Sequence, residues 1–334
     1  MVLEMNDTNH ESIAAEGEAS TEPQRAGWPI GVQLKPRVGA INDVQDLLEQ
    51  ARLVDRLGIG SAWFGQRFDL DSLSVAALVG ASVPGLAVGT AIVPINPRHP
   101  VVVASQAQTA QAASEGLFTL GLGLGAASLE AAAFGITERR PILRLREYLT
   151  VIRALINDGT ANFHGDTLVA QPPLSTAVRG GSQVPILVAA MGPQALAVSG
   201  ELADGTIPFL AGPRTIESHI LPAVGQAARR AGRPSPRVVA VVGAVVTDDP
   251  DRIRSVAAEQ MTFYEAIPSY RKVMDREGIH RAAELTVTGS EEQVTAGLRR
   301  YLDAGATEII VSQTELGGPA DQQRTWELVG SLSR

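Results

Sequence analysis

Short apolar runs alternate with longer amphipathic segments along most of the chain, and this alternation predicts strands and helices in turn. The runs are apolar at consecutive positions, which is typical of parallel strands buried on both faces. Eight such units favour closure into a (β/α)8 barrel, an α/β fold whose chemistry lies at the C-terminal ends of the strands. The eight predicted strands are Trp28 to Leu34, Ile59 to Phe64, Leu86 to Val93, Leu117 to Leu120, Val184 to Ala190, Thr206 to Phe209, Arg237 to Val246 and Ala306 to Val311.

Capping residues mark the ends of several predicted helices. Asn42 followed by Gln45 predicts the N-terminus of a helix that ends at Gly58, and Ser290 with Gln293 predicts another N-terminus. The junction of helix, glycine and strand recurs, which supports a repeating unit. Its further glycines are Gly116, Gly205 and Gly305.

Two stretches interrupt the repeat, and one precedes it. Residues 1–26 are polar and acidic, which predicts a disordered tail before a single barrel domain over residues 27–334. An insertion at about 159–183 contains hairpin residues and is expected to lie at the C-terminal rim. A second insertion, at about 261–285, carries Tyr264 and Tyr270 and is long enough to act as a lid.

The run Phe118-Thr-Leu-Gly-Leu-Gly-Leu-Gly125 ends a predicted strand in alternating glycines. The helix predicted from Ala126 would direct its free N-terminal amides at a ligand above these glycines, which outlines an anion site. Two other interpretations stay open. The run loosely fits the dinucleotide motif G-x-G-x-x-G/A, but the acidic residue nearest the required spacing, Glu147, lies in a helical segment. Alternatively, the glycines only allow a helix to pack closely on the strand.

A second strand end repeats this pattern at Ala189-Ala-Met-Gly-Pro-Gln194, where Pro193 suits the first turn of a helix. The two turns together are a candidate cradle for one phosphate, or else tight turns that bind nothing. The loop from Gly89 to Pro100 holds three prolines and is either a rigid apolar wall for a flat ring or a stiff connector. Arg67 and Arg98 are candidates for binding an acidic tail of the ligand.

Composition narrows the classes of partner. A formal net charge of -8 argues against nucleic acid and anionic membrane surfaces. The chain has no cysteine, and its five histidines lack metal-ligand spacing, so we expect no metal site. No apolar run is long enough to cross a bilayer and no signal peptide is recognisable, which predicts a cytoplasmic protein. The small-residue helices 72–82 and 101–114 predict a homodimer interface, or core packing beneath the tail.

Several motifs, taken in their order along the chain, make this sequence resemble the luciferase-like monooxygenase superfamily. The resemblance is closer to the deazaflavin (coenzyme F420)-dependent oxidoreductases of that superfamily. The resemblance implies a (β/α)8 barrel of the bacterial luciferase type, usually dimeric, with the coenzyme at its C-terminal mouth. The motifs are Gly89-Thr-Ala-Ile-Val-Pro with Pro97-Arg-His-Pro100, Phe118-Thr-Leu-Gly-Leu-Gly, Arg144-Leu-Arg-Glu-Tyr-Leu149, Val188-Ala-Ala-Met-Gly-Pro193, Gly200-Glu-Leu-Ala-Asp-Gly205 and Gly212-Pro-Arg-Thr215.

The same resemblance implies a set of coenzyme-binding residues. The phosphate would lie between the two glycine turns, and the ring would rest on the third strand, with a non-prolyl cis peptide between Ala91 and Ile92. The residues implied are Ala91, Ile92, Val93, Gly123, Gly125, Ala126, Ala190, Met191, Gly192, Pro193 and Ile207.

One departure from the family pattern concerns catalysis. Members that oxidise alcohols or sugars carry an Asp-His pair at the end of the second strand, where this chain has Gly65-Gln66. Glutamine cannot accept a proton from an alcohol. We therefore predict hydride transfer from the reduced coenzyme to an activated C=C or C=N bond of a small molecule, with Gln66 orienting the substrate or the ring. The alternatives are an FMN-dependent monooxygenase and a catalytically silent flavin-binding barrel.

Overall fold

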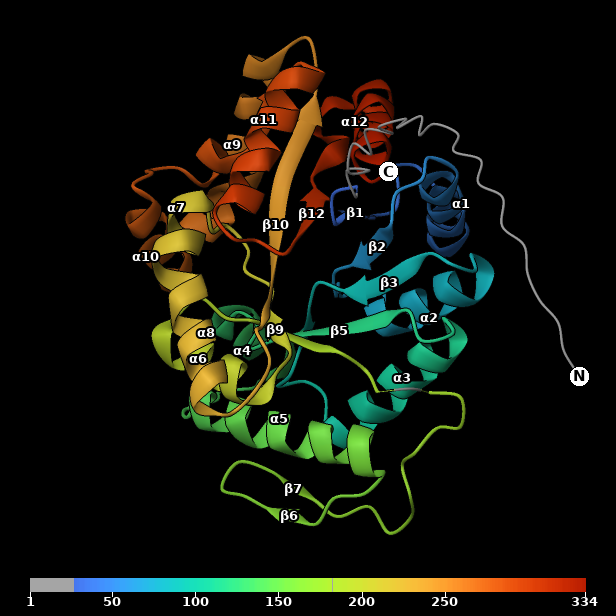
Figure 1. Cartoon of the computed structure of the whole chain (residues 1–334), viewed down its shortest axis with the longest axis vertical. Coiled ribbons are helices and arrows are strands. Elements are labelled where there is room, and N and C mark those ends of the chain that lie inside the picture. The colour runs from blue at the N-terminus through green and yellow to red at the C-terminus, as the bar shows by residue number, and fades with distance from the viewer. Residues whose placement is uncertain (1–26, 182) are drawn as a thin grey trace, which may run out of the picture.

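A closed barrel of eight parallel strands forms the centre of the molecule (Figure 1). The computed structural model describes residues 27–181 and 183–334, and the predicted tail, residues 1–26, lies outside them. Strand β10 pairs with β9 on one side and β12 on the other, which closes the ring. In order around the barrel the strands are β1 (Ile30–Gln33), β2 (Ser61–Phe64), β3 (Ala87–Thr90), β5 (Phe118–Gly123), β8 (Ile186–Ala189), β9 (Gly205–Thr206), β10 (Arg237–Val246) and β12 (Glu308–Ser312).

Helices surround the strands on the outside of this ring (Figure 1). Eight of them connect or follow the barrel strands: α1 (Asp43–Arg56), α2 (Ser72–Ser82), α3 (Pro100–Ala113), α5 (Pro141–Asp158), α6 (Pro193–Leu202), α8 (Leu221–Arg230), α11 (Glu291–Asp303) and α12 (Pro319–Leu332). Further elements lie between them: β4 (Val93–Pro94), α4 (Ala127–Phe134), α7 (Pro213–Thr215), α9 (Pro250–Glu265), α10 (Pro268–Glu277) and β11 (Val287–Gly289).

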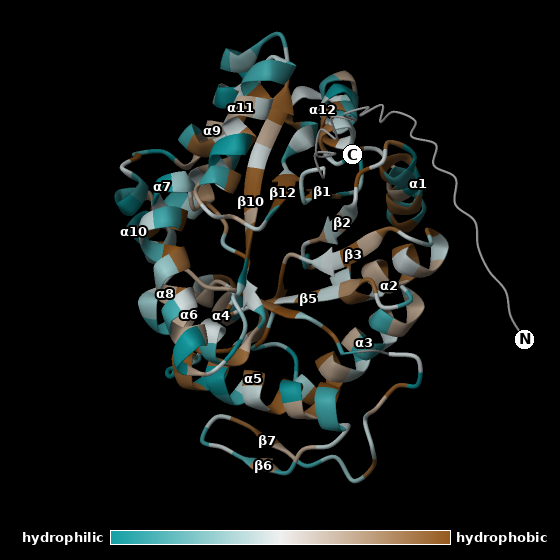
Figure 2. Cartoon of the chain, viewed as in Figure 1, coloured by the Kyte–Doolittle hydropathy of each residue, from teal (hydrophilic) through white to brown (hydrophobic). Residues whose placement is uncertain are grey.

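Burial explains why the strands are apolar at consecutive positions. One set of side chains packs outward against the helices, and the other fills the barrel interior, so the strands appear hydrophobic while the outer helix faces are polar (Figure 2). Trp63 is the largest interior side chain and is 2% exposed. Gly89 on the adjacent strand makes room for it, because a Cβ there would collide with the indole ring.

The predicted helix ends are largely confirmed. The Asn42 side chain accepts a hydrogen bond of 3.0 Å from the Gln45 backbone, and Gly58 follows the helix with a φ of +82°. Ser290 forms the expected reciprocal capping box at the start of α11. These contacts satisfy backbone groups that helix ends leave unpaired, so local sequence was sufficient to predict them.

Gly205 differs from the other junction glycines. Gly116 and Gly305 have positive φ values of +92° and +97°, as their position after a helix predicts. Gly205 instead lies within β9, where a Cβ would collide with the Arg237 backbone of β10. The junction of helix, glycine and strand is present there, but Gly205 has no positive φ, and it serves the close approach of two strands where the barrel closes.

The first insertion contains the predicted hairpin, formed by β6 (Phe163–His164) and β7 (Val169–Ala170). The Glu147 carboxylate on α5 anchors its turn by accepting hydrogen bonds of 2.8 Å from the backbone amides of Asp166 and Thr167. Anchoring the hairpin therefore accounts for Glu147 within the Arg144–Leu149 motif. The dinucleotide interpretation would have required this acidic residue at the end of a strand, but it lies on helix α5.

The second insertion, at about 261–285, contains the end of α9, all of α10 and a short 3-10 helix at Ala282–Leu285. Glu265 fixes it by pairing with the Arg281 guanidinium at 2.9 Å and by accepting from the Ala282 amide at 3.0 Å. No helix within residues 27–181 and 183–334 is long and apolar enough to cross a membrane.

Candidate active site

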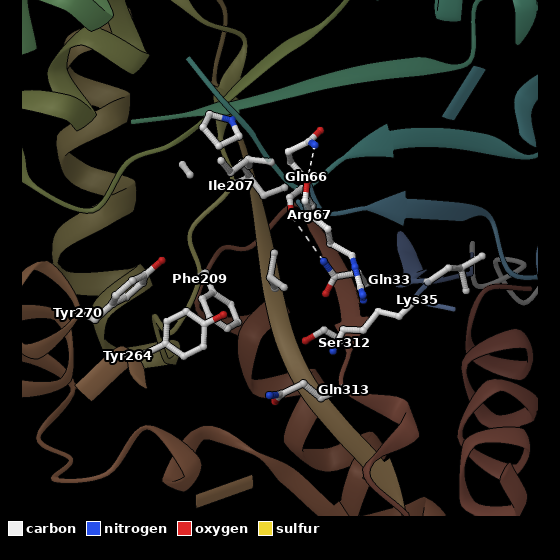
Figure 3. A pocket seen from close by; sticks show the side chains of 17 residues that line it. Gln33, Lys35, Gln66, Arg67, Ile207, Phe209, Tyr264, Tyr270, Ser312 and Gln313 are labelled. Atoms are coloured by element: carbon white, nitrogen blue, oxygen red, sulfur yellow. Dashed lines mark hydrogen bonds between the residues drawn. The ribbon is translucent and has the colours of Figure 1, made fainter. Parts of the chain in front are cut away.

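A cavity of about 400 Å³ opens at the C-terminal ends of the barrel strands (Figure 3). Its volume lies in the range of small-molecule sites, roughly 300–1,000 Å³. Every barrel strand, or the loop after it, contributes to the wall except β5. The lining residues are Gln33, Leu34, Lys35, Gly65, Gln66, Arg67, Ala91, Ile92, Pro94, Ala189, Ile207, Phe209, Val241, Tyr264, Tyr270, Ser312 and Gln313.

The apolar floor comes from the end of the third strand. The expected cis peptide is present between Ala91 and Ile92, and both residues line the cavity. Gln33 Nε2 lies 3.5 Å from the Ala91 carbonyl oxygen, and Ile207 forms part of the barrel interior beside them. Val93 is fully buried in β4 and does not line the cavity, although the resemblance implied a ring contact there.

The two glycine turns lie next to each other. Gly123 at the end of β5 is in register with Ala189 at the end of β8, so the following turns share one edge of the barrel. Helices α4 and α6 begin after these turns, and no described side chain caps either N-terminus. Their first amides are therefore available to an anion.

The α6 turn is the more open of the two. A Cβ at Gly192 would meet no described atom within 4 Å. The Met191 carbonyl oxygen lies 3.1 Å from His219 Nε2, and Pro193 occupies the first position of α6. Ala190 is fully buried and does not line the cavity, although the resemblance implied a ligand contact there. This turn fits a phosphate through main-chain amides alone.

The α4 turn contains an acidic side chain that the sequence did not indicate. Glu130 is 5% exposed, and its carboxylate folds back against Gly125, leaving no room for a Cβ there. Glu130 Oε2 accepts 2.7 Å from Asn96 Nδ2, while Glu130 Oε1 has no partner among the described residues. Burial raises the pKa of Glu130 despite the opposing effect of the Asn96 hydrogen bond.

Gln66 lines the cavity, but its side-chain amide is fully used within the protein. Its Nε2 donates to the Arg67 and Leu70 carbonyl oxygens at 2.7 and 3.1 Å. Its Oε1 accepts from Ser72, through both the backbone amide and the hydroxyl, and from Arg98. The predicted role of Gln66 toward a ligand stays a prediction, and these bonds leave it no free donor.

An aromatic wall stands on the opposite side, and motif analysis did not assign it a role. Phe209 packs against Tyr264 and Tyr270 with ring centroids 5.1 and 6.1 Å apart, and the two tyrosines are 5.3 Å apart. All three contacts are edge-to-face, an arrangement that aromatic quadrupoles favour. The length of the second insertion and its two tyrosines were the sequence signals for this wall.

Charged groups in the lining are already paired. Lys35 forms an ion pair with Glu315 at 2.6 Å, and Arg67 forms one with Asp69 at 2.6 Å. Arg98 pairs with Asp71, so neither arginine proposed for an acidic tail is without a carboxylate. Among the described residues that line the cavity, none is Asp, Glu or His.

Comparisons with known proteins agree with this architecture. The sequence model of the luciferase-like monooxygenase family matches residues 24–321. The chain is 24% identical over 266 residues to 5,10-methylenetetrahydromethanopterin reductase of Methanolobus tindarius, covering 78% of each protein.

Two solved structures show a similar fold. The coenzyme F420-dependent tetrahydromethanopterin reductase of Methanopyrus kandleri superposes with a TM-score of 0.71 at 21% identity, covering 91% of this chain and 98% of the other. The FMN complex of the oxygenating constituent of 3,6-diketocamphane monooxygenase from Pseudomonas putida has a TM-score of 0.73 at 15% identity, covering 92% and 97%.

Proposed function

The chain belongs to the luciferase-like monooxygenase family, and on this premise we propose that it is an F420-dependent oxidoreductase. In the proposed reaction, the reduced deazaflavin passes a hydride to an activated C=C or C=N bond of a small molecule. One observation carries the proposal: two uncapped helix N-termini follow β5 and β8 at the end of the barrel where Ala91, Ile92 and Ala189 line the cavity. Two similar proteins support the proposal: the methylenetetrahydromethanopterin reductase of Methanolobus tindarius and the F420-dependent tetrahydromethanopterin reductase of Methanopyrus kandleri.

Apart from the Glu130 carboxylate beside Gly125, the residues present fit the coenzyme. The amides at the starts of α4 and α6, near Gly125, Ala126 and Gly192, would hold its phosphate, and Ala91 with Ile92 would support its ring. When bound, the reduced coenzyme supplies a hydride. The chain contributes the anion site, the apolar support and exclusion of water from the floor.

The chemistry of the lining favours the reductive direction. Oxidation of an alcohol requires a base for the hydroxyl proton, and carboxylate or imidazole normally provides it. The described lining holds neither, but it holds two phenols, which are donors at neutral pH. Addition of a hydride to a double bond needs a proton donor, so this set of side chains suits reduction.

Gln66 has a positioning function in this proposal. Its five hydrogen bonds join the end of β2 to the start of α2 and to Arg98, which fixes the loop that carries Arg67. The loop borders the cavity, so Gln66 would act on the substrate through the shape of the wall.

Fluorescence titration with F420 and with FMN tests the choice of coenzyme. We expect F420 to bind at micromolar concentration and FMN to bind weakly. Tight FMN binding without a response to F420 would favour the FMN-dependent monooxygenase, for which a structural neighbour with FMN exists. F420 binding without hydride transfer to any acceptor would favour a catalytically silent flavin-binding barrel.

We also propose a homodimer formed through α2 and α3. These helices pack side by side and expose apolar side chains, including Leu78 at 48% and Val102 at 51%. Exposed apolar residues on neighbouring helices are typical of a subunit interface.

A further inference from the structure

We propose that the Tyr264 hydroxyl donates the hydrogen bond and the proton of this site, and that the substrate is an uncharged conjugated carbonyl compound or imine. The acceptor would be the carbonyl oxygen or imine nitrogen at the end of the conjugated system. This inference rests on the proposed function, because it names the donor and the substrate class for the same cavity.

Tyr264 is held at the cavity by rings on three sides. Its ring contacts Phe209, Tyr270 and Phe263 at centroid distances of 5.1, 5.3 and 5.6 Å. The end of α9, where it lies, is fixed by Glu265 through Arg281. The ring therefore has little freedom to turn, so the direction of its hydroxyl is set by packing.

The hydroxyl of Tyr264 is free to bind a ligand. It points into the cavity, toward strand β10, in Figure 3. No hydrogen bond joins it to any described residue, although most half-buried phenols find a partner. Burial raises the pKa of Tyr264, so the phenol stays protonated at neutral pH and can act as a donor.

Tyr270 is the less suitable of the two phenols. In Figure 3, Tyr270 lies farther from strand β10 than Tyr264 does. Its ring packs on Phe209, with the two ring centroids 6.1 Å apart. Burial raises its pKa, and the neighbouring Tyr264 raises it further. We assign it the support of the Tyr264 ring, which also makes it a matched control.

The remaining polar groups indicate an uncharged substrate. Lys35 and Arg67 are neutralised by Glu315 and Asp69, so the lining offers no unpaired charge to a carboxylate or phosphate of the substrate. Ser312 Oγ is buried without a partner among described residues, and Gln33 has donor capacity beyond its Ala91 contact. Hydroxyls, an amide and an aromatic wall suit a flat, neutral molecule with hydrogen-bonding atoms.

The proposed step is balanced. The hydride that the coenzyme supplies forms a C–H bond at the far carbon of the conjugated C=C bond, or at the carbon of C=N. The π electron pair moves to the terminal oxygen or nitrogen. The Tyr264 O–H bond breaks and its proton joins that pair, giving an enol, which becomes the ketone in water, or an amine. Water then returns a proton to Tyr264.

The test uses 2-cyclohexen-1-one as acceptor and reduced F420 under single-turnover conditions. Tyr264→Phe keeps the ring and removes the hydroxyl, so we expect the rate constant of reduction to fall about 100-fold or more, as for loss of a general acid. Tyr270→Phe keeps the ring that supports Tyr264, so its rate constant should fall much less than that of Tyr264→Phe, because no proton passes through it. Equal rates for Tyr264→Phe and wild type, or a large loss confined to Tyr270→Phe, would overturn the assignment.

A binding measurement separates this inference from the proposed function. Calorimetric titration of the coenzyme-free protein with cyclohexanone should show binding that Tyr264→Phe weakens about fivefold, the effect of one lost hydrogen bond. Unchanged affinity, or no binding to wild type, would overturn the hydrogen bond to Tyr264. If the wild-type protein does not oxidise reduced F420 with any acceptor, the proposed function and the proton-transfer step are both overturned. The titration with cyclohexanone would still show whether Tyr264 donates a hydrogen bond to a ligand. An unchanged melting temperature for Tyr264→Phe shows that the fold is retained.

Discussion

Replacing Glu130 by glutamine tests whether the α4 turn binds the coenzyme phosphate. The Glu130 carboxylate lies against Gly125, beside amides that would hold the phosphate, and one of its oxygens has no described partner. Glutamine has the same shape and can still accept from Asn96 through its amide oxygen. The substitution therefore removes a negative charge with little change in packing.

The expected gain in affinity follows from Coulomb's law. Two unit charges about 5 Å apart at an effective dielectric constant of about 20 repel by about 3 kcal/mol. Screening by solvent at the rim reduces this, so we expect Glu130→Gln to tighten binding by about tenfold, or about 1.4 kcal/mol. The effect should also depend on pH. Because the pKa of Glu130 is raised, wild-type affinity should fall as pH rises through that pKa, and the variant should lose this dependence.

Fluorescence titration with F420 and with its phosphate-free deazaflavin riboside measures the effect. The gain should appear for F420 and be absent for the riboside, because only the former carries the phosphate. Equal affinities of wild type and Glu130→Gln for F420 across the pH range would refute a phosphate at the α4 turn. A gain for both ligands would point to a change in the ring site.

Three further substitutions test other parts of the account. Glu147→Ala removes the anchor of the β6–β7 hairpin and should lower the free energy of unfolding by about 2–3 kcal/mol in denaturant titration. Burial opposes ionisation of Glu147, but hydrogen bonds from Thr167 and Asp166 lower its pKa, so the difference from wild type should shrink as pH falls through that pKa; a constant difference would contradict this. Gln66→Ala should lower the free energy of unfolding by about 2 kcal/mol, because Ser72 and Arg98 lose an acceptor. If the Gln66→Ala protein is as stable as wild type but has a slower turnover, the result would contradict the positioning role and favour direct binding of the substrate by Gln66. Val102→Glu should convert a dimer to a monomer in sedimentation, and a monomeric wild type would reject the interface.

Much of the fold could be predicted because each unit repeats the same local signals. Consecutive apolar residues identified all eight barrel strands, since parallel strands are buried on both faces. Caps such as Asn42 and Ser290 act within three residues, so they are visible in sequence. Short edge elements such as β11 were missed, because three residues at the margin of the sheet carry no distinct pattern.

Only those parts of the candidate site that the backbone forms could be predicted from the sequence. The glycine turns at the ends of β5 and β8 and the cis peptide at Ala91 were expected from motifs and resemblance. Side chains brought together by tertiary packing were not: Phe209 meets Tyr264 across 55 positions of sequence. Likewise, nothing in the sequence showed that Glu130 folds back on Gly125 or that the amide of Gln66 is used internally.

A crystal structure of the protein with bound F420 tests the central claim most directly. The account predicts phosphate oxygens about 3 Å from backbone amides at the N-termini of both α4 and α6, with the deazaflavin ring against Ala91 and Ile92. A phosphate held elsewhere, or a ring that leaves the cavity floor empty, would contradict it.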